Sequence, residues 1–205
     1  MADLRFDGRV AVVTGGGRGL GRSYALLLAS RGAKVVVNDP GGSLDGEGVD
    51  SGPAESVVSE ITAAGGQAVA CTESVSTPEG GDSIVRTALD HYGRLDILVH
   101  NAGNVRGGSL KEMSYEDFDA VLDVHLRGAF NVVRPAFPLM CEAGYGRIVL
   151  TSSIVHDDRH TPGLSAMTAR ATRPASAMNS SPVTEHDSCA SQPTTGATSS
   201  EPIGG

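Results

Sequence analysis

The stretch that decides the fold spans residues 10–21 and reads Val-Ala-Val-Val-Thr-Gly-Gly-Gly-Arg-Gly-Leu-Gly. Its first four residues form a continuous apolar run, which is typical of a strand buried on both faces of a parallel sheet. Thr14 then opens a glycine-rich turn, and Gly21 leads into an apolar segment that predicts a helix. Such a turn gathers free backbone N–H groups at the positive end of a helix dipole, an arrangement that suits a pyrophosphate.

Glycines are needed in this turn because a side chain would obstruct it. A Cβ at Gly15, Gly19 or Gly21 would block the tight turn, the approach of a phosphate or the packing of the helix on the strand. A glycine-rich turn can also be a plain connection, so the pattern alone is a weak signal. Here it follows a strand, opens a helix and precedes a second apolar run at 34–37, which favours a dinucleotide site.

The second apolar run ends in Asn38-Asp39. An acidic residue at this point accepts hydrogen bonds from both ribose hydroxyls of an adenosine and repels a 2′-phosphate. Asp39 therefore favours NAD over NADP. Arg18, inside the turn, favours the opposite choice because an arginine pairs well with a phosphate. We give Asp39 the greater weight and predict NAD as the cofactor.

Short apolar runs alternate with helical patterns up to residue 153. This alternation predicts βαβ units with right-handed crossovers, and hence an α/β fold with a doubly wound parallel sheet, Rossmann-like and truncated after about the fifth strand. Ser114 and Asp117 form a capping box for the last helix, which Pro135 and Pro138 are expected to kink or shorten. Further strands are expected at 34–37, 67–71, 95–99 and 147–151, and helices at 21–30, 54–64, 78–92 and from 114 toward 140.

The composition limits the possible partners. The chain has 205 residues, 40% of them hydrophobic, and a formal net charge of −8. This length supports one domain with a sizeable core, and the negative charge disfavours nucleic acid or an anionic membrane as partner. No segment resembles a signal peptide or approaches membrane-spanning length. Cys71, Cys141 and Cys189 lack metal-ligand spacing, so we predict no metal site and a reducing, cytoplasmic environment.

Three motifs occur in order along the chain: the turn at 14–21, Asn101-Ala102-Gly103, and Gly146-Arg147-Ile148-Val149 ahead of Ser152-Ser153. Together they resemble the short-chain dehydrogenase/reductase family over roughly residues 5–153. Two further segments resemble one branch of it, the 3-hydroxyacyl-CoA dehydrogenase domain of peroxisomal multifunctional enzymes and its bacterial relatives. These segments are residues 35–39 with Gly41-Gly42, and Val124-His125-Leu126-Arg127-Gly128. The long loop at 40–53 is similar to theirs.

The resemblance implies NAD-dependent oxidation of a secondary alcohol or a 3-hydroxyacyl thioester to the ketone, by an enzyme that forms homo-oligomers in the family. It also implies a role for each matching position. The residues implied to hold or line the cofactor are Thr14, Gly15, Arg18, Gly19, Leu20, Gly21, Asp39, Glu73, Ser74, Asn101, Ala102 and Gly103. Glu73 stands where the family usually has an adenine-contacting aspartate.

Two positions are implied to be catalytic. Ser153 would hydrogen-bond the substrate carbonyl or hydroxyl, and His125 stands where most members have a catalytic asparagine. Structural alternatives stay open from the residues alone. Ser153 could simply end a strand, His125 could be a hydrogen-bonded helix residue, and Asn101 is more readily structural than chemical.

The chemistry of the family depends on a tyrosine and a lysine one helical turn apart, because the lysine lowers the pKa of the tyrosine that takes the proton. From Ser153, the register of the family puts this pair near positions 166 and 170, where the chain has Ala166 and Arg170. The last tyrosine is Tyr145 and the last lysine is Lys111. An arginine cannot replace the lysine, because a guanidinium stays charged.

The composition changes at the same place. Residues 1–155 read as the dinucleotide-binding domain, whereas 156–205 is a low-complexity tail with no apolar period and no aromatic residue. We expect this tail either to be disordered or to result from a change of reading frame, and we favour the second. Two functions follow as hypotheses: an NAD-dependent dehydrogenase acting on a small-molecule substrate, or a catalytically inactive NAD-binding fragment.

Overall fold

The computed structural model describes residues 4–43, 46–48, 50–106 and 111–152. They all belong to the first of two compact units, which spans Met1–Arg170. The tail predicted for residues 156–205, its boundary at 155 and the candidate Ser153 lie outside the described residues.

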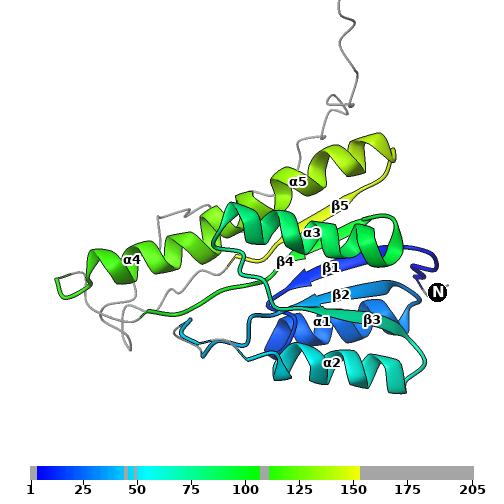
Figure 1. Cartoon of the computed structure of the whole chain (residues 1–205), viewed down its shortest axis with the longest axis horizontal. Coiled ribbons are helices and arrows are strands. Elements are labelled where there is room, and N and C mark those ends of the chain that lie inside the picture. Colours follow the sequence, from blue (N-terminus) through cyan, green and yellow to red (C-terminus); the bar gives the residue numbers. More distant parts are fainter. Residues whose placement is uncertain (1–3, 44–45, 49, 107–110, 153–205) are drawn as a thin grey trace, which may run out of the picture. The chain divides into compact units, whose positions relative to one another are not determined.

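Five parallel strands form one sheet in the order β3-β2-β1-β4-β5 (Figure 1). Their register aligns the carboxyl ends, since Thr14 at the end of β1 pairs with both Asn38 of β2 and His100 of β4. The order reverses direction between β1 and β4, and ligands of open α/β sheets bind at such a point. The strands are β1 (Val10–Thr14), β2 (Lys34–Asn38), β3 (Gln67–Cys71), β4 (Ile97–His100) and β5 (Arg147–Leu150).

Helices cover both faces of the sheet (Figure 1). One face, with Val13 and Val37, packs against α1 and α2, and the other, with Val12 and Leu98, packs against α3 and α5. The alternate residues of each strand thus face different cores, which is why the strands read as continuous apolar runs. The doubly wound Rossmann-like fold is confirmed. The helices are α1 (Gly19–Ser30), α2 (Gly52–Ala63), α3 (Pro78–Tyr92), α4 (Tyr115–Leu122) and α5 (Gly128–Glu142).

The two prolines do not shorten the last helix, so that part of the expectation was wrong. Pro135 and Pro138 both lie inside α5, which continues to Glu142. A proline leaves the carbonyl four residues earlier without its helical N–H partner. For Pro135 this is the Asn131 carbonyl, which faces Gly81 of α3 so closely that a Cβ there would lie 2.3 Å from it. Close packing against α3 therefore holds the helix at this proline.

The irregular part of this helix lies before the prolines. Between α4 and α5 the chain forms one π-helical segment, η1 (Asp123–Arg127), which contains His125. Single π-helical turns often occur at functional sites. The capping box is confirmed, because Ser114 Oγ accepts a hydrogen bond from the Asp117 N–H at 3.0 Å.

At the amino edge of the sheet, Asp96 is buried with its side chain 1% exposed. Its carboxylate accepts hydrogen bonds from the Val10 N–H, from Arg9 and from Arg94 at 2.7–2.9 Å. The Arg9 guanidinium also lies 3.7 Å from the ring centroid of Tyr145, which precedes β5. One buried charge therefore ties β1, β4 and the start of β5 together.

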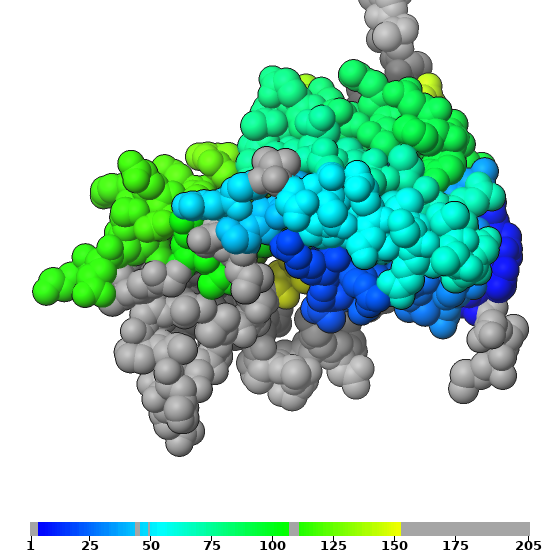
Figure 2. All heavy atoms as spheres, turned by 60° about the horizontal axis from the view of Figure 1, so that its bottom comes forward, coloured from blue at the N-terminus to red at the C-terminus, as the bar shows by residue number. Residues whose placement is uncertain are grey.

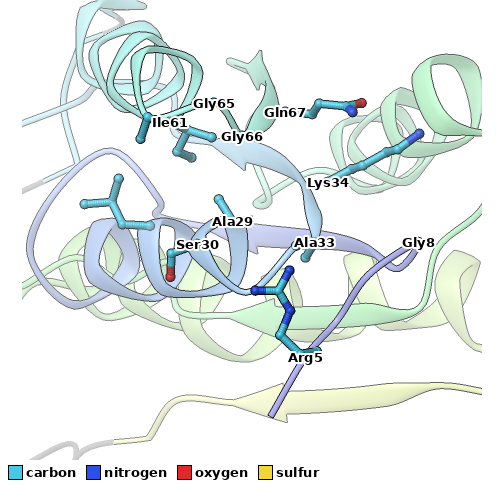
Figure 3. Close-up of a pocket in the computed structure, with 13 residues that line it drawn as sticks. Arg5, Gly8, Ala29, Ser30, Ala33, Lys34, Ile61, Gly65, Gly66 and Gln67 are labelled. Carbon is cyan, nitrogen blue, oxygen red and sulfur yellow. The ribbon is translucent and has the colours of Figure 1, made fainter. Parts of the chain in front are cut away.

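A cavity of about 510 Å³ also opens at the amino edge, where α1 and α2 end. Figure 3 shows Arg5 and Gly8 before β1, and Lys34 and Gln67 at the first residues of β2 and β3, around it. The Lys34 ammonium lies 5.5 Å from the ring centroid of Tyr92. This cavity is at the end of the sheet opposite to the glycine-rich turn.

Candidate dinucleotide site

The glycine-rich turn joins the carboxyl end of β1 to α1, and its three key glycines differ in their surroundings. A Cβ at Gly15 would lie 2.9 Å from Ala102 Cα, and one at Gly21 would lie 2.0 Å from the Gly15 carbonyl oxygen. Gly19 has a φ of +51° and no atom within 4 Å of a Cβ position. The first and third glycines thus allow the close packing of the turn, while the second leaves open space beside the backbone.

The start of α1 carries no competing group for its free N–H donors. Arg18 occupies the N-cap position without a side-chain cap, and the first turn contains no acidic residue. Leu20 in this turn is 61% exposed, so its apolar side chain does not pack in the hydrophobic core. Uncapped N–H groups at the positive end of a helix bind anions.

Asp39 follows β2 and faces the turn. Its Oδ2 accepts a hydrogen bond from the Gly17 N–H at 2.9 Å, and its Oδ1 accepts one from the Gly41 N–H at 2.8 Å. Each carboxylate oxygen can accept a second hydrogen bond. The turn and the loop therefore hold Asp39 in place and leave it able to accept from a ligand.

Arg18, the residue that favoured NADP, donates a hydrogen bond to the Gly42 carbonyl at 2.8 Å. Its guanidinium thus connects the turn to the loop that follows β2. Figure 2 shows this loop, in light blue, extending away from α2 toward the green segments that follow β4. There Arg106 lies 3.4 Å from a carboxylate oxygen of Glu47 and 3.6 Å from one of Asp117.

Thr14 joins β1 to β4 at the same edge. Its hydroxyl oxygen accepts hydrogen bonds from the N–H groups of Asn101 and Ala102, both at 3.1 Å, and lies 3.1 Å from His100 Nδ1. The Asn101 side chain donates to the Gly15 carbonyl at 3.2 Å. The Thr14 and Asn101 side chains thus fix the turn and the chain after β4 relative to each other.

Glu73 and Ser74 follow β3, and their position depends on a residue that the motif analysis missed. Asn38 is fully buried and donates to the backbone carbonyls of Cys71 and Glu73 at 3.1 and 2.8 Å. The Ser74 Oγ accepts a hydrogen bond from the Ser76 N–H at 3.2 Å. Asn38 therefore brings the chain after β3 to the same edge as Asp39.

His125 lies against the chain that leaves β4. Its Nε2 is 2.9 Å from the carbonyl oxygen and 3.2 Å from the backbone nitrogen of Asn104. A Cβ at Gly103 would lie 2.7 Å from the His125 ring, so the glycine makes room for it. The residue is exposed, and its place in the site is therefore beside the segment 101–104.

The structure brings the residues of the turn, Asp39, segment 101–103 and His125 to one edge of the sheet. Three polar residues at this edge, Asn38, His100 and Asn104, were missed because no motif contains them. For Asn38 and His100 the sequence does contain a signal, since each is a polar residue that ends a buried apolar run. Asn104 carries no such signal, because its burial depends on contacts with α4 and η1.

Within the described residues, no helix is long and apolar enough to cross a membrane. The same residues contain no group of three or more His, Cys, Asp or Glu side chains arranged to hold a metal ion.

The fold and this edge define a Rossmann-type α/β domain with a glycine-rich turn at the end of β1. Comparison with known proteins gives the family. A family model described as short chain dehydrogenase matches residues 9–169. The chain belongs to the short-chain dehydrogenase family, whose members are oxidoreductases acting on CH–OH groups. The match extends beyond residue 153, where the resemblance seen in the motifs ended.

Two curated relatives illustrate the similarity. The peroxisomal multifunctional enzyme type 2 of Drosophila melanogaster is 55% identical over 150 residues, which cover 73% of this chain and 25% of the relative. A short-chain type dehydrogenase/reductase of Mycobacterium tuberculosis is 52% identical over 145 residues, which cover 71% of this chain and 51% of the relative. The chain thus spans about half or less of the length of these relatives.

Two solved structures share the fold. A short chain dehydrogenase from Mycobacterium avium has a TM-score of 0.65 and 48% identity, covering 72% of this chain and 53% of that one. A 7α-hydroxysteroid dehydrogenase in complex with NADH and 7-oxo glycochenodeoxycholic acid has a TM-score of 0.63 and 32% identity, covering 70% and 52%.

Proposed function

We propose that the described domain binds NAD(H) at the carboxyl edge of β1, β2 and β4, and that it prefers NAD(H) to NADP(H). The observation that carries this proposal is Asp39, which two backbone N–H groups hold at the end of β2 facing the turn. The open space at Gly19 and the uncapped start of α1 fit a pyrophosphate. The relative solved with NADH gives further support.

The charge of Asp39 supports the preference between the two cofactors. Two like charges about 4 Å apart repel by roughly 1 kcal/mol in water and about 4 kcal/mol near a protein surface. A cofactor with a 2′-phosphate beside Asp39 would therefore bind about fivefold to about a thousandfold more weakly. Arg18 does not offset this repulsion in the described arrangement, since it donates to the Gly42 carbonyl.

For the whole protein we propose a substrate with a secondary alcohol, and among such substrates a 3-hydroxyacyl thioester. The names of the relatives support this class, because several are peroxisomal multifunctional or hydratase-dehydrogenase-epimerase enzymes. A bound nicotinamide would accept the hydride. This chain's own residues would hold the cofactor and, at segment 101–104, border the place of reaction. A cytoplasmic location stays a prediction, since these relatives are peroxisomal by name.

A second candidate, an NAD-binding chain without turnover, is favoured by one observation. The chain has no tyrosine after Tyr145 and no lysine after Lys111, so it lacks the proton-transferring pair of the family. A positioned general acid or base contributes roughly 10²–10⁴-fold to a rate. We therefore expect NADH formation by the purified chain to stay near background with secondary alcohols and 3-hydroxyacyl thioesters. Robust turnover that is lost in His125→Ala would instead favour the dehydrogenase.

The binding proposal is tested by titrating the full chain with NADH and NADPH, using cofactor fluorescence. We expect tighter binding of NADH, and a smaller or reversed preference in Asp39→Asn. Gly19→Ala should abolish binding, because its side chain would occupy the open space beside the turn. Equal affinity for both cofactors in the unmutated chain would contradict the assignment.

The matched control for Gly19→Ala is Gly93→Ala. Gly93 ends α3 with a φ of +75° and, like Gly19, has no atom within 4 Å of a Cβ position. Both substitutions impose a similar backbone strain of about 1 kcal/mol. Only the one at Gly19 is near the proposed ligand, so loss of binding in both variants would indicate damage to the fold rather than to the site.

A further inference from the structure

The contact between His125 and Asn104 has an unusual property. One ring nitrogen, Nε2, lies within hydrogen-bonding distance of both the carbonyl oxygen and the N–H of the same residue, at 2.9 and 3.2 Å. A histidine nitrogen either carries a proton and donates or is bare and accepts. The ring can therefore bind one of these two backbone groups at a time, and the presence or absence of a proton on Nε2 decides which.

This contact reaches the candidate site through the backbone. Asn104 is 9% exposed, and its side-chain amide donates to the Ala120 carbonyl of α4 at 3.1 Å. The residues just before it, Asn101 and Ala102, contact Gly15 of the glycine-rich turn. Asn104 is thus only two or three residues along the chain from groups that contact the turn. A change in its hydrogen bonds can therefore reach the turn through the backbone.

A second histidine nearby, His100, has a lowered pKa, so it takes up a proton less readily than an ordinary histidine. Both acceptor positions of the Thr14 hydroxyl are occupied by the N–H groups of Asn101 and Ala102, so its own proton points to His100 Nδ1. His100 then carries its single proton on Nε2. Burial lowers the pKa of His100 and outweighs the backbone groups of Val124 and His125, which favour the charged form, while the His125 side chain disfavours it electrostatically.

The other ionisable groups around the His125 ring come from its own element and from the chain after β4. Asp123 and Arg127 of η1 form an ion pair with each other. Arg106 lies two residues beyond Asn104 and near the carboxylates of Glu47 and Asp117. His125 itself is exposed and accessible to a proton from solvent.

We propose that His125 is a positioning residue whose protonation selects which backbone group of Asn104 it holds, and that it thereby sets the order of segment 101–104 beside the cofactor. A neutral ring with its proton on Nδ1 accepts from the Asn104 N–H at Nε2. A protonated ring can only donate to the carbonyl, which leaves that N–H without its partner. Cofactor affinity then weakens in acid. The inference rests on the proposed NAD(H) site.

The experiment follows NADH binding to the full chain from about pH 8 to about pH 5.5, the range in which histidines ordinarily titrate. One backbone hydrogen bond corresponds to a change of about two- to tenfold in the dissociation constant. In the unmutated chain we expect the NADH dissociation constant to rise by this factor as the pH falls. In His125→Asn we expect it to be independent of pH. An asparagine amide does not titrate and offers a donor and an acceptor together, so both Asn104 groups can stay bound.

The control variant is His91→Gln, which removes an exposed histidine on α3 whose Nδ1 lies 3.0 Å from the Thr87 carbonyl. It should keep the pH profile of the unmutated chain. If His125→Asn keeps that profile as well, another group titrates and the proposal is overturned.

A measurement without cofactor separates this proposal from the proposed function. In the free chain, the NMR shift of the Asn104 amide should titrate together with the His125 ring nitrogens and become constant in His125→Asn. If NADH fails to bind at any pH while this titration occurs, the proposed function is wrong and the role of His125 in holding Asn104 remains. If the amide does not follow the ring, the role of His125 is refuted.

Discussion

The two edges of the sheet differ in whether their buried polar side-chain atoms have hydrogen-bond partners. At the amino edge, Asp96 is buried, and hydrogen bonds from Arg9, Arg94 and the Val10 N–H saturate its carboxylate. At the carboxyl edge, polar atoms are buried without a partner. All four such side-chain atoms found in the described residues lie there: Asn38 Oδ1, His100 Nε2, Asn104 Oδ1 and Arg106 Nε.

The difference indicates that the amino edge contributes to stability, whereas the carboxyl edge is available for function. Buried polar groups normally find partners, and each exception calls for an explanation. Since the exceptions gather at the edge where the strand order reverses, the carboxyl edge is incomplete in the way expected of a ligand site. At the amino edge, by contrast, the carboxylate of the buried Asp96 has its hydrogen-bond partners, as expected of a structural element.

We expect Asp96→Asn, at the amino edge, to lower stability more than any of the other proposed substitutions. The substitution leaves Arg9 and Arg94 without their buried counter-charge and points amide N–H groups at other donors. Because the two arginines are partly exposed, the loss falls at the lower end of what a broken buried pair costs, and we expect the free energy of unfolding to fall by about 3 kcal/mol. Urea denaturation followed by circular dichroism measures the change, and NADH affinity of the folded protein should stay the same.

Asp7→Asn is the control for this prediction. Asp7 also pairs with an arginine at the same edge, with Arg5 at 2.7 Å, but both side chains are more than half exposed. Exposed pairs contribute little because water screens them. We therefore expect the unfolding of Asp7→Asn to match that of the unmutated chain, and an equal loss in both variants would show that burial at Asp96 is not the cause.

The second prediction concerns Thr14, whose side chain accepts from two backbone donors at the carboxyl edge. Thr14→Val keeps the shape of the residue but leaves the N–H groups of Asn101 and Ala102 without their acceptor. A buried donor without a partner costs about 1–3 kcal/mol, so the urea midpoint should fall without a change in slope. NADH affinity should fall too, because the turn and segment 101–102 separate.

Thr14→Ser tests whether the hydroxyl, rather than the methyl group, carries this effect. Serine retains the acceptor oxygen and the donor to His100, so it should restore most of the stability and the affinity. If serine behaves like valine, the packing of the threonine methyl group matters more than its hydrogen bonds.

Much of the fold could be predicted from the chain because periodicity is a local property. The continuous apolar runs gave the parallel strands within two residues at their ends, and Ser114 with Asp117 marked the start of α4. The glycine spacing and Asp39 placed the turn and the end of β2 at one edge. These features depend on residues close together in sequence, where propensity and spacing are informative.

The missed features depend on contacts between distant residues. Helix-breaking propensity at Pro135 was overridden by the close approach of Gly81, more than fifty positions earlier in the chain. The π-helical turn at His125 and its contact with Asn104, 21 residues away, have no signature in periodicity. Buried polar partners such as Asn38 are likewise set by tertiary packing, so a motif comparison does not find them.

The last and smallest predicted effect is the acid dependence of stability at the saturated edge. Burial raises the pKa of Asp96, but the hydrogen bonds from Arg94, Val10 and Arg9 and the charge of Arg94 outweigh it, so its pKa lies below the ordinary value. In the unfolded chain the pKa of an aspartate is about 3.9. The unfolded state therefore takes up the proton first as the pH falls. The contribution of Asp96 is full above the unfolded pKa and disappears as the pH falls through the folded one.

Burial and hydrogen bonding oppose each other at this carboxyl. Measured from about pH 7 down to about pH 3, the difference in unfolding free energy between the unmutated chain and Asp96→Asn should narrow once the pH passes the unfolded pKa. Asp7, whose pKa is also lowered, chiefly by its hydrogen bond with Arg5, is present in both proteins and cancels in the difference. A difference that stays constant over this range would mean that Asp96 does not titrate between the folded and unfolded states. Asp96 would then stabilise the amino edge through packing and hydrogen-bond geometry. Its charge would contribute nothing to the free energy of unfolding.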